Sequence, residues 1–167
     1  MNRVLVALGS NQNNPRQQIQ AAVDVLSHKF EHIKFSSMYL TQAVGEVEQR
    51  SFINAVVSFQ TSMSAPELLD FLLGLEQKAG RDKVNEIFKG PRNLDLDIIL
   101  FGDTICTMET LQIPHPRFRE RRFVLEPAAE IAGEMLDPIT QKNISKILAE
   151  CNDPNWVKVL DDEMVIA

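Results

Sequence analysis

Six short segments of residues 1–101 have apolar residues at the spacing of a strand or of a helix. The order of these segments limits the possible folds more than any other feature. The apolar run Val4–Leu8 predicts a buried strand that ends at Gly9. Apolar residues at helical spacing follow Pro15, and a second such stripe follows Ser64. Residues 33–40, 51–61 and 94–101 have the composition of strands. The predicted order is therefore strand, helix, strand, strand, helix, strand.

This order is that of a ferredoxin-like sandwich, an α+β fold with an antiparallel sheet and helices packed on one face. Ser64 and Glu67 have the spacing of a capping box, and Gly80 is a plausible end for the second helix. Residues 121–132 and 143–151 predict short helices, and residues 156–161 predict a last edge strand. We therefore expect residues 1–167 to form a single domain with a C-terminal elaboration.

The charge distribution excludes some classes of binding partner. The net charge is −6, yet residues 1–122 carry 14 basic and 14 acidic side chains, and residues 123–167 carry 3 and 9. This balance excludes a global basic footprint for nucleic acid or an anionic membrane. The longest apolar run has five residues, far too few to span a bilayer. Two cysteines and the absence of a signal-peptide pattern predict a cytoplasmic protein.

The strongest chemical motif is GPRNLDLD at residues 90–97. On a strand, Asp95 and Asp97 project from one face, with Ile99 and Phe101 expected further along it. Neighbouring carboxylates repel, and a divalent cation such as Mg²⁺ would offset that repulsion, since it binds through one or two carboxylates plus substrate phosphates. Arg92 has a planar guanidinium suited to phosphate oxygens. A solvated strand end with local salt bridges is the alternative.

Basic side chains gather around this motif. Residues 81–122 contain eight of the 17 basic residues and seven acids. Close carboxylates among basic side chains are what a metal–triphosphate site needs, although an ordinary mixed surface would have the same composition. The eight basic residues are Arg81, Lys83, Lys89, Arg92, Arg117, Arg119, Arg121 and Arg122.

Other residues are candidates for ligand contacts. His115 lies between two prolines, which restrict its backbone, so its imidazole could donate to a phosphate or simply pack in a turn. Phe52, Asn54 and Phe123 could bind a flat heterocycle by stacking and amide hydrogen bonds, although each Phe could equally belong to the core. No zinc-ligand spacing or phosphate-binding GxxxxGK[ST] loop is present.

Taken in order, these blocks resemble the 6-hydroxymethyl-7,8-dihydropterin pyrophosphokinase family. The resemblance covers roughly residues 2–137 and rests on ALGSN, FINA, GPRNLDLDI, the Pro-His pair and RRFVL. It implies a ferredoxin-like core and transfer of the β,γ-pyrophosphoryl group of ATP to the hydroxymethyl oxygen of the pterin in folate biosynthesis, with AMP as the other product. It also implies two Mg²⁺ ions, ATP as co-substrate and small-molecule substrates only. We expect a monomer.

The resemblance assigns roles to individual residues. Asp95 and Asp97 would be the metal ligands, Arg92 and Arg121 would stabilise charge on the transferred group, and Asp95 would also lie at the pterin. The remaining assignments place Glu76, Arg81, Lys83, Arg92, Ile98, His115 and Arg121 at ATP, and Thr41, Val44, Phe52, Asn54 and Phe123 at the pterin.

The sequence also departs from the family pattern. Lys83 stands where an arginine is common, Phe88 and Lys89 replace an Arg-Trp pair, and Thr110 and Gln112 replace an Arg and a Thr of the ATP site. These departures keep a second hypothesis open, a nucleotide- or protein-binding module without catalysis. Polar segments 41–50 and 82–90 flank the expected site, and we expect them to become ordered when ATP binds.

Overall fold

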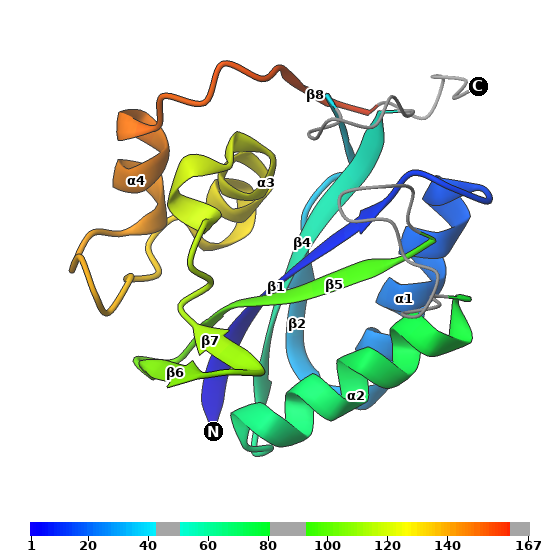
Figure 1. Ribbon diagram of the computed structural model, residues 1–167, viewed down its shortest axis with the longest axis horizontal. Coiled ribbons are helices and arrows are strands. Elements are labelled where there is room, and N and C mark those ends of the chain that lie inside the picture. Colours follow the sequence, from blue (N-terminus) through cyan, green and yellow to red (C-terminus); the bar gives the residue numbers. More distant parts are fainter. Residues whose placement is uncertain (43–50, 81–92, 161–167) are drawn as a thin grey trace.

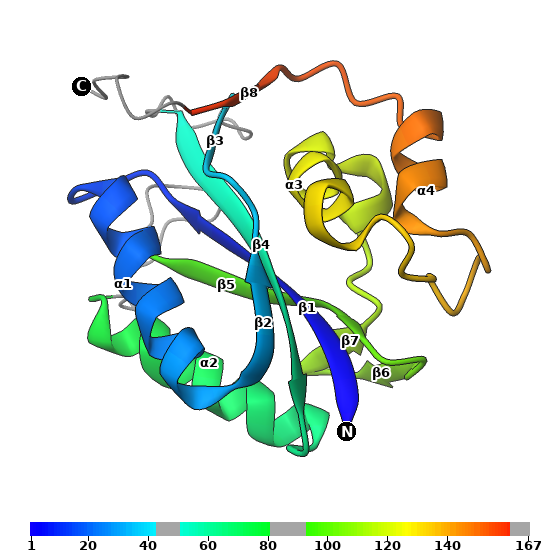
Figure 2. The same ribbon diagram turned by 180° about the vertical axis from the view of Figure 1, so that it is seen from behind.

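The computed structural model describes residues 1–42, 51–80 and 93–160, which form an antiparallel sheet with helices on both faces (Figures 1 and 2). The elements along the chain are β1 (Asn2–Ser10), α1 (Pro15–Lys29), β2 (Glu31–Phe35), β3 (Tyr39–Thr41), β4 (Phe52–Thr61), α2 (Ala65–Lys78), β5 (Asp95–Phe101), β6 (Cys106–Met108), β7 (Leu111–Ile113), the 3₁₀ helix η1 (Phe118–Glu120), α3 (Arg122–Ala132), α4 (Ile144–Glu150) and β8 (Val157–Val159).

In the described part of the chain, the main sheet has the strand order β5-β1-β4-β3-β8, and β2 also pairs with β4. β6 and β7 form a separate hairpin. The single strand predicted over residues 33–40 is wrong, because two strands occupy this region and Ser36–Met38 separate them. Ser36 leaves the regular pattern there, since its hydroxyl accepts a hydrogen bond from the backbone N–H of Val56 at 2.9 Å.

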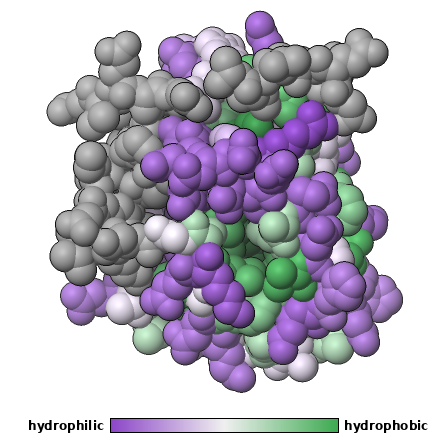
Figure 3. Space-filling model, turned by 90° about the vertical axis from the view of Figure 1, so that its right-hand side faces the viewer, coloured by the Kyte–Doolittle hydropathy of each residue, from purple (hydrophilic) through white to green (hydrophobic). Residues whose placement is uncertain are grey.

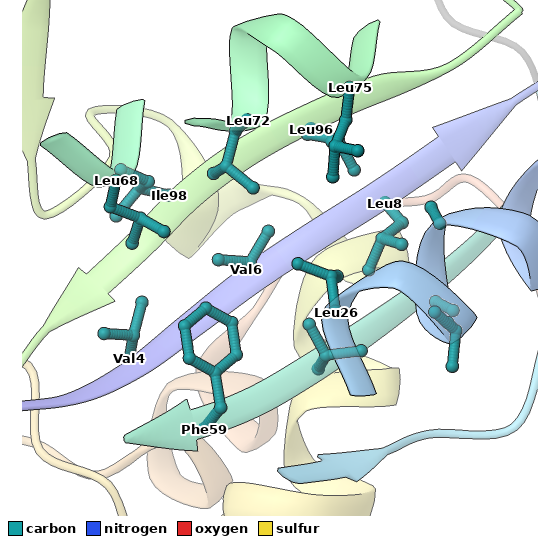
Figure 4. Packing of buried hydrophobic residues seen from close by; sticks show 14 of the residues in the cluster. Val4, Val6, Leu8, Leu26, Phe59, Leu68, Leu72, Leu75, Leu96 and Ile98 are labelled. Carbon is teal, nitrogen blue, oxygen red and sulfur yellow. The ribbon is translucent and has the colours of Figure 1, made fainter. Parts of the chain in front are cut away.

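One face of the sheet forms the larger core, under α1 and α2. Alternate residues of each strand point into it, as strand periodicity requires. Figure 4 shows side chains from three strands meeting those from both helices. The labelled residues are Val4, Val6, Leu8, Leu26, Phe59, Leu68, Leu72, Leu75, Leu96 and Ile98. From the side where α1 and α2 lie, hydrophobic side chains remain visible between hydrophilic ones (Figure 3).

The opposite face is also covered, so the expectation of helices on one face only is incomplete. α3 and α4 pack there over a second cluster that includes Leu5 and Val56 from the sheet and Val124 and Leu125 from α3. Both helices come from the stretch predicted as a C-terminal elaboration. This second layer covers the sheet face that carries the Asp pair and leaves part of that face to polar residues.

A β-bulge in β5 overturns one prediction about that face. Leu5 pairs with Leu100 but Val6 pairs with Ile98, so Ile99 is an extra residue in the strand. Ile99 and Leu100 both join the cluster under α3, whereas Phe101 joins the core under α2. The expected placement of Phe101 beside the Asp pair is therefore wrong, because the bulge interrupts strict alternation after Ile98.

The predicted ends of α2 are confirmed. The Ser64 hydroxyl accepts from the Glu67 N–H at 3.3 Å, and the Glu67 carboxylate accepts from the Ser64 N–H at 3.2 Å, which completes the capping box. Gly80 follows α2 with a φ of +96°, a value that favours glycine. In the part of the chain that the structure describes, none of the helices combines the length and apolar character needed to cross a membrane.

Candidate active site

Asn54, Asp95 and Asp97 lie in two neighbouring rows across the sheet on the face under α3. In the first row, Asn54 of β4 pairs with Gly9 of β1, and Gly9 pairs with Asp95 of β5. In the next row, Ala7 of β1 lies between Val56 and Asp97. The two carboxylates are partly exposed at one end of β5, as strand periodicity predicted. The sheet register thus brings Asn54, from a distant part of the sequence, into line with Asp95.

Gly9 permits this arrangement because a side chain there would collide with Asn54. A Cβ atom on Gly9 would lie 2.8 Å from Asn54 Oδ1 and 3.6 Å from Phe52 Cδ1. Asn54 is 8% exposed, and its Nδ2 donates to Thr41 Oγ1 at 2.6 Å. The side chains of Phe52 and Asn54 therefore lie over Gly9, and the Thr41 hydroxyl holds the Asn54 amide in position. The structure brings together three residues expected at the pterin.

Arg121 lies at the end of η1, within electrostatic range of both carboxylates. Burial lowers the pKa of its guanidinium below the ordinary value, while the negative charges of Asp97 and Asp95 act in the opposite direction. Its guanidinium carbon also lies 5.6 Å from the centre of the Phe123 ring. Arg121 therefore connects the acidic end of β5 with the first turn of α3.

His115 is fixed beside the same strand as a neutral donor. Its backbone N–H donates to the Ile99 carbonyl at 3.0 Å, and its ring Nδ1 accepts from the backbone N–H of Arg117 at 3.1 Å. Burial, reinforced by the positive charges of Arg121 and Arg117, lowers the pKa of His115 to about 4. A neutral imidazole whose Nδ1 accepts a hydrogen bond carries its proton on Nε2. His115 can therefore donate from Nε2 to an anionic ligand at neutral pH.

A cavity of about 230 Å³ lies along the outer edge of β5, between α2 and the β6–β7 hairpin. Apolar side chains from all three elements line it, and Asp97 and His115 supply polar groups. Thr110 and Gln112, two positions that depart from the family pattern, also line it. The complete lining is Leu69, Leu96, Asp97, Ile98, Glu109, Thr110, Leu111, Gln112, His115 and Pro116. The cavity combines an apolar wall with groups suited to phosphate or metal, as a nucleotide site requires.

Several arginines expected to supply charge for phosphates instead hold the fold. Arg119 forms two hydrogen bonds with the buried Asp137 carboxylate, at 2.6 and 2.9 Å, and Arg117 pairs with Glu120 at 2.9 Å. Arg122 contacts Glu126 and the backbone near Asp153. From composition alone, each of these side chains is expected to add positive charge near the acidic pair. Arg121 faces the acidic pair, since the negative charges of Asp97 and Asp95 act on the pKa of its guanidinium.

Three other expected site residues have roles in packing. Glu76 of α2 is 2% exposed, and its Oε2 accepts from the Leu96 N–H at 2.8 Å, between the two Asp residues. Phe123 is half-buried and packs against the cluster under α3. Ile98 is buried and contributes to the cavity wall. The interpretations of Arg81, Lys83, Arg92 and Val44, and of the segments 43–50 and 82–90, concern residues that lie outside those described.

The donor chemistry fits a magnesium ion held jointly with a substrate. In the described ranges, no group of three or more His, Cys, Asp or Glu side chains is arranged around one point. Asp95 and Asp97 supply two carboxylates on one face, and Mg²⁺ is commonly bound by one or two carboxylates together with substrate phosphates and water. The pair therefore suits a cation that arrives with a polyphosphate.

Sequence reasoning missed Gly9 and Asp137 as determinants of the site. The apolar run predicts a strand that ends at Gly9, although a glycine inside a strand pattern is also a signal for close approach of another group. Asp137 gave no signal, because its partner Arg119 is 18 residues away in the sequence.

Comparison with known proteins identifies the family. Residues 5–133 match the family described as 7,8-dihydro-6-hydroxymethylpterin-pyrophosphokinase (HPPK). The chain belongs to this family. Two curated members, both named 2-amino-4-hydroxy-6-hydroxymethyldihydropteridine pyrophosphokinase, illustrate the HPPK relationship. The Pseudomonas aeruginosa protein is 38% identical over 151 residues, covering 89% of this chain and 91% of its own. The Haemophilus influenzae protein is 35% identical over 156 residues, covering 92% and 96%.

Solved structures support the fold of this HPPK family member. A crystal structure of Plasmodium falciparum HPPK-DHPS has a TM-score of 0.69 and 13% identity, covering 89% of this chain. This chain spans only 45% of that longer protein. At this level of identity, the likeness shows that a mixed helix and sheet architecture is shared.

Proposed function

We propose that this protein transfers the β,γ-pyrophosphoryl group of ATP to the hydroxymethyl oxygen of 6-hydroxymethyl-7,8-dihydropterin in folate biosynthesis, giving AMP and the pterin diphosphate. One observation carries the proposal. Asp97 lines the cavity beside β5, whereas Asp95 shares a sheet row with Asn54. The carboxylate pair therefore lies between the cavity beside β5 and a polar row suited to a flat heterocycle. The family membership and the names of its relatives support the same reaction.

On the nucleotide side, the described residues bind and orient the triphosphate. The cavity beside β5 would take the nucleoside, with Ile98 in its wall. The neutral His115 would donate from Nε2 to a phosphate oxygen, and Arg121 would stabilise negative charge on the transferred group. Glu76 acts from α2 through its hydrogen bond to the Leu96 N–H. Arg81, Lys83 and Arg92 complete the proposed ATP site on the basis of sequence.

On the pterin side, the residues over Gly9 hold a planar ring. The Asn54 amide offers donor and acceptor groups to ring nitrogen and oxygen atoms, and Thr41 fixes its orientation. Phe52 and Phe123 would stack against the ring, and Val44 belongs to the same site by sequence. Phosphoryl-type transfer depends mainly on positioning and charge stabilisation, which are the tasks these side chains perform.

The site is proposed to use two Mg²⁺ ions, with Asp95 and Asp97 as the protein ligands. When bound, Mg²⁺ neutralises charge on the polyphosphate and orients it toward the acceptor hydroxyl. The two carboxylates project from one strand face, so the backbone of β5 sets their relative position.

A direct assay tests this function. Purified protein is incubated with ATP, Mg²⁺ and 6-hydroxymethyl-7,8-dihydropterin, and the products are separated and quantified. AMP and pterin diphosphate in equal amounts support the proposal. ADP as the product, or folded protein that binds ATP without releasing AMP, would overturn it and favour a nucleotide-binding module. Omitting Mg²⁺ should abolish product formation, and unchanged turnover with a chelator present would contradict the metal role.

The finer assignments of fold and setting are also proposals. We propose a ferredoxin-like core, which is supported by the order β5-β1-β4-β3 and by the helix that follows β1 and the helix that follows β4. We further propose that residues 1–167 form one domain that acts as a cytoplasmic monomer on small molecules rather than on nucleic acid or membranes. Size-exclusion chromatography with light scattering checks the oligomeric state, and a dimer would contradict it.

A further inference from the structure

The segment from Cys151 to Leu160 lies beyond the matched family residues 5–133 and joins two elements of the proposed pterin site. It leaves α4, crosses the N-terminus of α3 and ends as β8 beside β3 (Figure 1). α3 begins with Arg122 and Phe123, and β3 ends with Thr41. We define this segment, Cys151–Leu160, as the C-terminal strap.

Asp153 attaches the strap to α3. Its Oδ2 accepts from the Arg122 N–H at 2.9 Å, where the first turn of a helix has N–H groups without helical partners. The Arg122 guanidinium donates in return to the carbonyls of Asp153 and Cys151, at 3.2 and 3.1 Å. Asp153 Oδ1 accepts from the backbone and side chain of Asn155, at 3.0 and 2.8 Å. One carboxylate thus binds the helix end and shapes the turn that leads to β8.

The other end of the strap attaches to β3. Val157 and Val159 pair with Thr41 and Tyr39, and the Gln42 N–H donates to the Trp156 carbonyl at 3.3 Å. Thr41 in turn accepts the hydrogen bond from Asn54. The strap therefore continues through main-chain pairing to the residue that orients the Asn54 amide.

A second tie between α3 and β3 lies further along the helix. The Glu130 carboxylate accepts from the Tyr39 hydroxyl at 2.6 Å and from the Ser37 N–H at 2.9 Å. Glu130 is eight residues after Arg122, which corresponds to about 12 Å along a helix at 1.5 Å per residue. This tie holds the later turns of α3. The first turn, which carries Phe123, is held by the core contacts of Val124 and Leu125 and by its attachment through Asp153.

We propose that Asp153 is a positioning residue for the heterocyclic substrate, which it serves by setting the place of Phe123 relative to Asn54 and Thr41. This inference rests on the proposed function, because it assumes that a flat pterin lies between the Phe123 ring and the Asn54 amide. Asp153 itself acts through Arg122 and β8 and makes no contact with the substrate in this scheme.

The test compares Asp153→Ala with the wild type in steady-state kinetics and in equilibrium titration with the pterin. Removing the carboxylate takes away the attachment between the strap and the first turn of α3, so we expect the pterin KM and Kd to rise about tenfold, as loss of a helix cap permits. The KM for ATP should rise less, by about twofold at most, because the ATP site includes Arg121 beside Arg122 but also His115 and the cavity beside β5, which lie outside the strap. Asp153→Asn keeps one acceptor oxygen and should recover part of the pterin affinity.

Glu150→Ala is the matched control. Glu150 is the last residue of α4 and forms an exposed ion pair with Lys142, and it takes no part in the hydrogen bonds that join the strap to α3 and β3. Thermal unfolding of every variant separates positioning from loss of fold. An unchanged pterin Kd in folded Asp153→Ala, or an equal rise in the KM of both substrates, would overturn the inference. If Asp153→Ala does not fold, Asp153→Asn must show the selective pterin effect, or the inference fails.

The same measurements distinguish this inference from the proposed function. Wild-type protein that releases AMP while Asp153 variants keep full pterin affinity would refute the positioning role alone. Wild-type protein that neither binds the pterin nor releases AMP would refute the proposed function and, with it, the positioning role.

Discussion

The two ends of one sheet face differ in what covers them. At one end, Leu5 and Leu100 pair across β1 and β5 and lie in the cluster sealed by α3 and α4. At the other end, the same strands carry Gly9 and Asp95, next to Asn54 on β4. Along this one face the residue type changes from apolar to polar, and in β5 the bulge at Ile99 lies between Leu100 and Asp95. A single sheet face therefore anchors a hydrophobic layer and presents a polar site within a few residues.

This difference explains why the site is held firmly. The helices that seal the apolar end also carry the groups that reach the polar end, since η1 and α3 contribute Arg121 and Phe123. The buried Asp137 carboxylate fixes Arg119 on η1, two residues before Arg121. The apolar end thus anchors the elements that carry Arg121 and Phe123, whereas the polar residues of the sheet are placed by the strands, and substitutions should separate these two contributions.

The largest expected effect is at the polar end, from Asp97→Asn. The amide keeps the shape of the side chain but removes the negative charge that would hold Mg²⁺, so turnover should fall about a thousandfold with stability almost unchanged. Product formation and a thermal melt measure the two quantities. Asp103→Asn, in the exposed turn after β5, is the control and should keep full activity. Comparable turnover in Asp97→Asn and the wild type would refute the metal role.

The second prediction concerns the apolar end. Leu5 is fully buried, and Leu5→Ala should lower the free energy of unfolding by about 3 kcal/mol, through lost burial and a residual cavity. Turnover per folded molecule should stay within about twofold, because the row of Leu5 is separate from that of Asn54. Denaturant unfolding and kinetics well below the melting temperature check both claims. A loss of activity without loss of stability would contradict the separation of the two ends.

A smaller effect is expected at Gly9, where the polar end of the sheet leaves no room for a side chain. Gly9→Ala places a Cβ 2.8 Å from Asn54 Oδ1, and Thr41 holds that amide, so Asn54 must shift. Pterin affinity should fall about tenfold, as measured by equilibrium titration.

Gly74→Ala is the matched control for this substitution, because nothing lies within 4 Å of its Cβ position in α2. It should raise the free energy of unfolding by about 0.5–1 kcal/mol and leave pterin affinity unchanged. Equal pterin affinity in the Gly9 and Gly74 variants would remove the argument that Gly9 makes room for Asn54.

The last prediction is a pH dependence of stability at His115. The unfolded chain protonates this imidazole near 6.5, whereas burial and two arginines lower the folded pKa to about 4. Between these values the unfolded state binds more protons, so the wild type should lose stability relative to His115→Gln as pH falls from 6.5 toward 4. Above this window, the two proteins should show a constant difference. Parallel stability curves throughout would contradict the lowered pKa.

Most of the element order could be predicted from the sequence because periodicity and end signals agreed. The capping box at Ser64, the glycine at Gly80 and the apolar stripes locate both early helices within a few residues. The break between β2 and β3 could not be predicted, because it depends on a hydrogen bond from Val56 to Ser36 across the sheet. Long-range pairing of this kind leaves no local pattern.

For the candidate site, the sequence predicted the shared face of Asp95 and Asp97 through strand alternation. Residue chemistry proposed Asn54 and His115 as ligand contacts, and the resemblance added a role for Arg121. Which arginines serve the site was not predictable from charge, since the partners of Arg119 and Arg122 lie 18 and 31 residues away. Only the folded chain shows that Asp137 and Asp153 engage them.

The bulge at Ile99 determines where β5 can change in length. Because Ile99 is the extra residue, a chain that lacks it would still place Leu100 under α3 and Phe101 under α2. Loss of Leu96 would instead make the two aspartates adjacent, so that they would point to opposite faces. In an alignment of this strand, a one-residue gap after Ile98 therefore leaves the acidic pair intact. A one-residue gap between Asp95 and Asp97 would disrupt the pair.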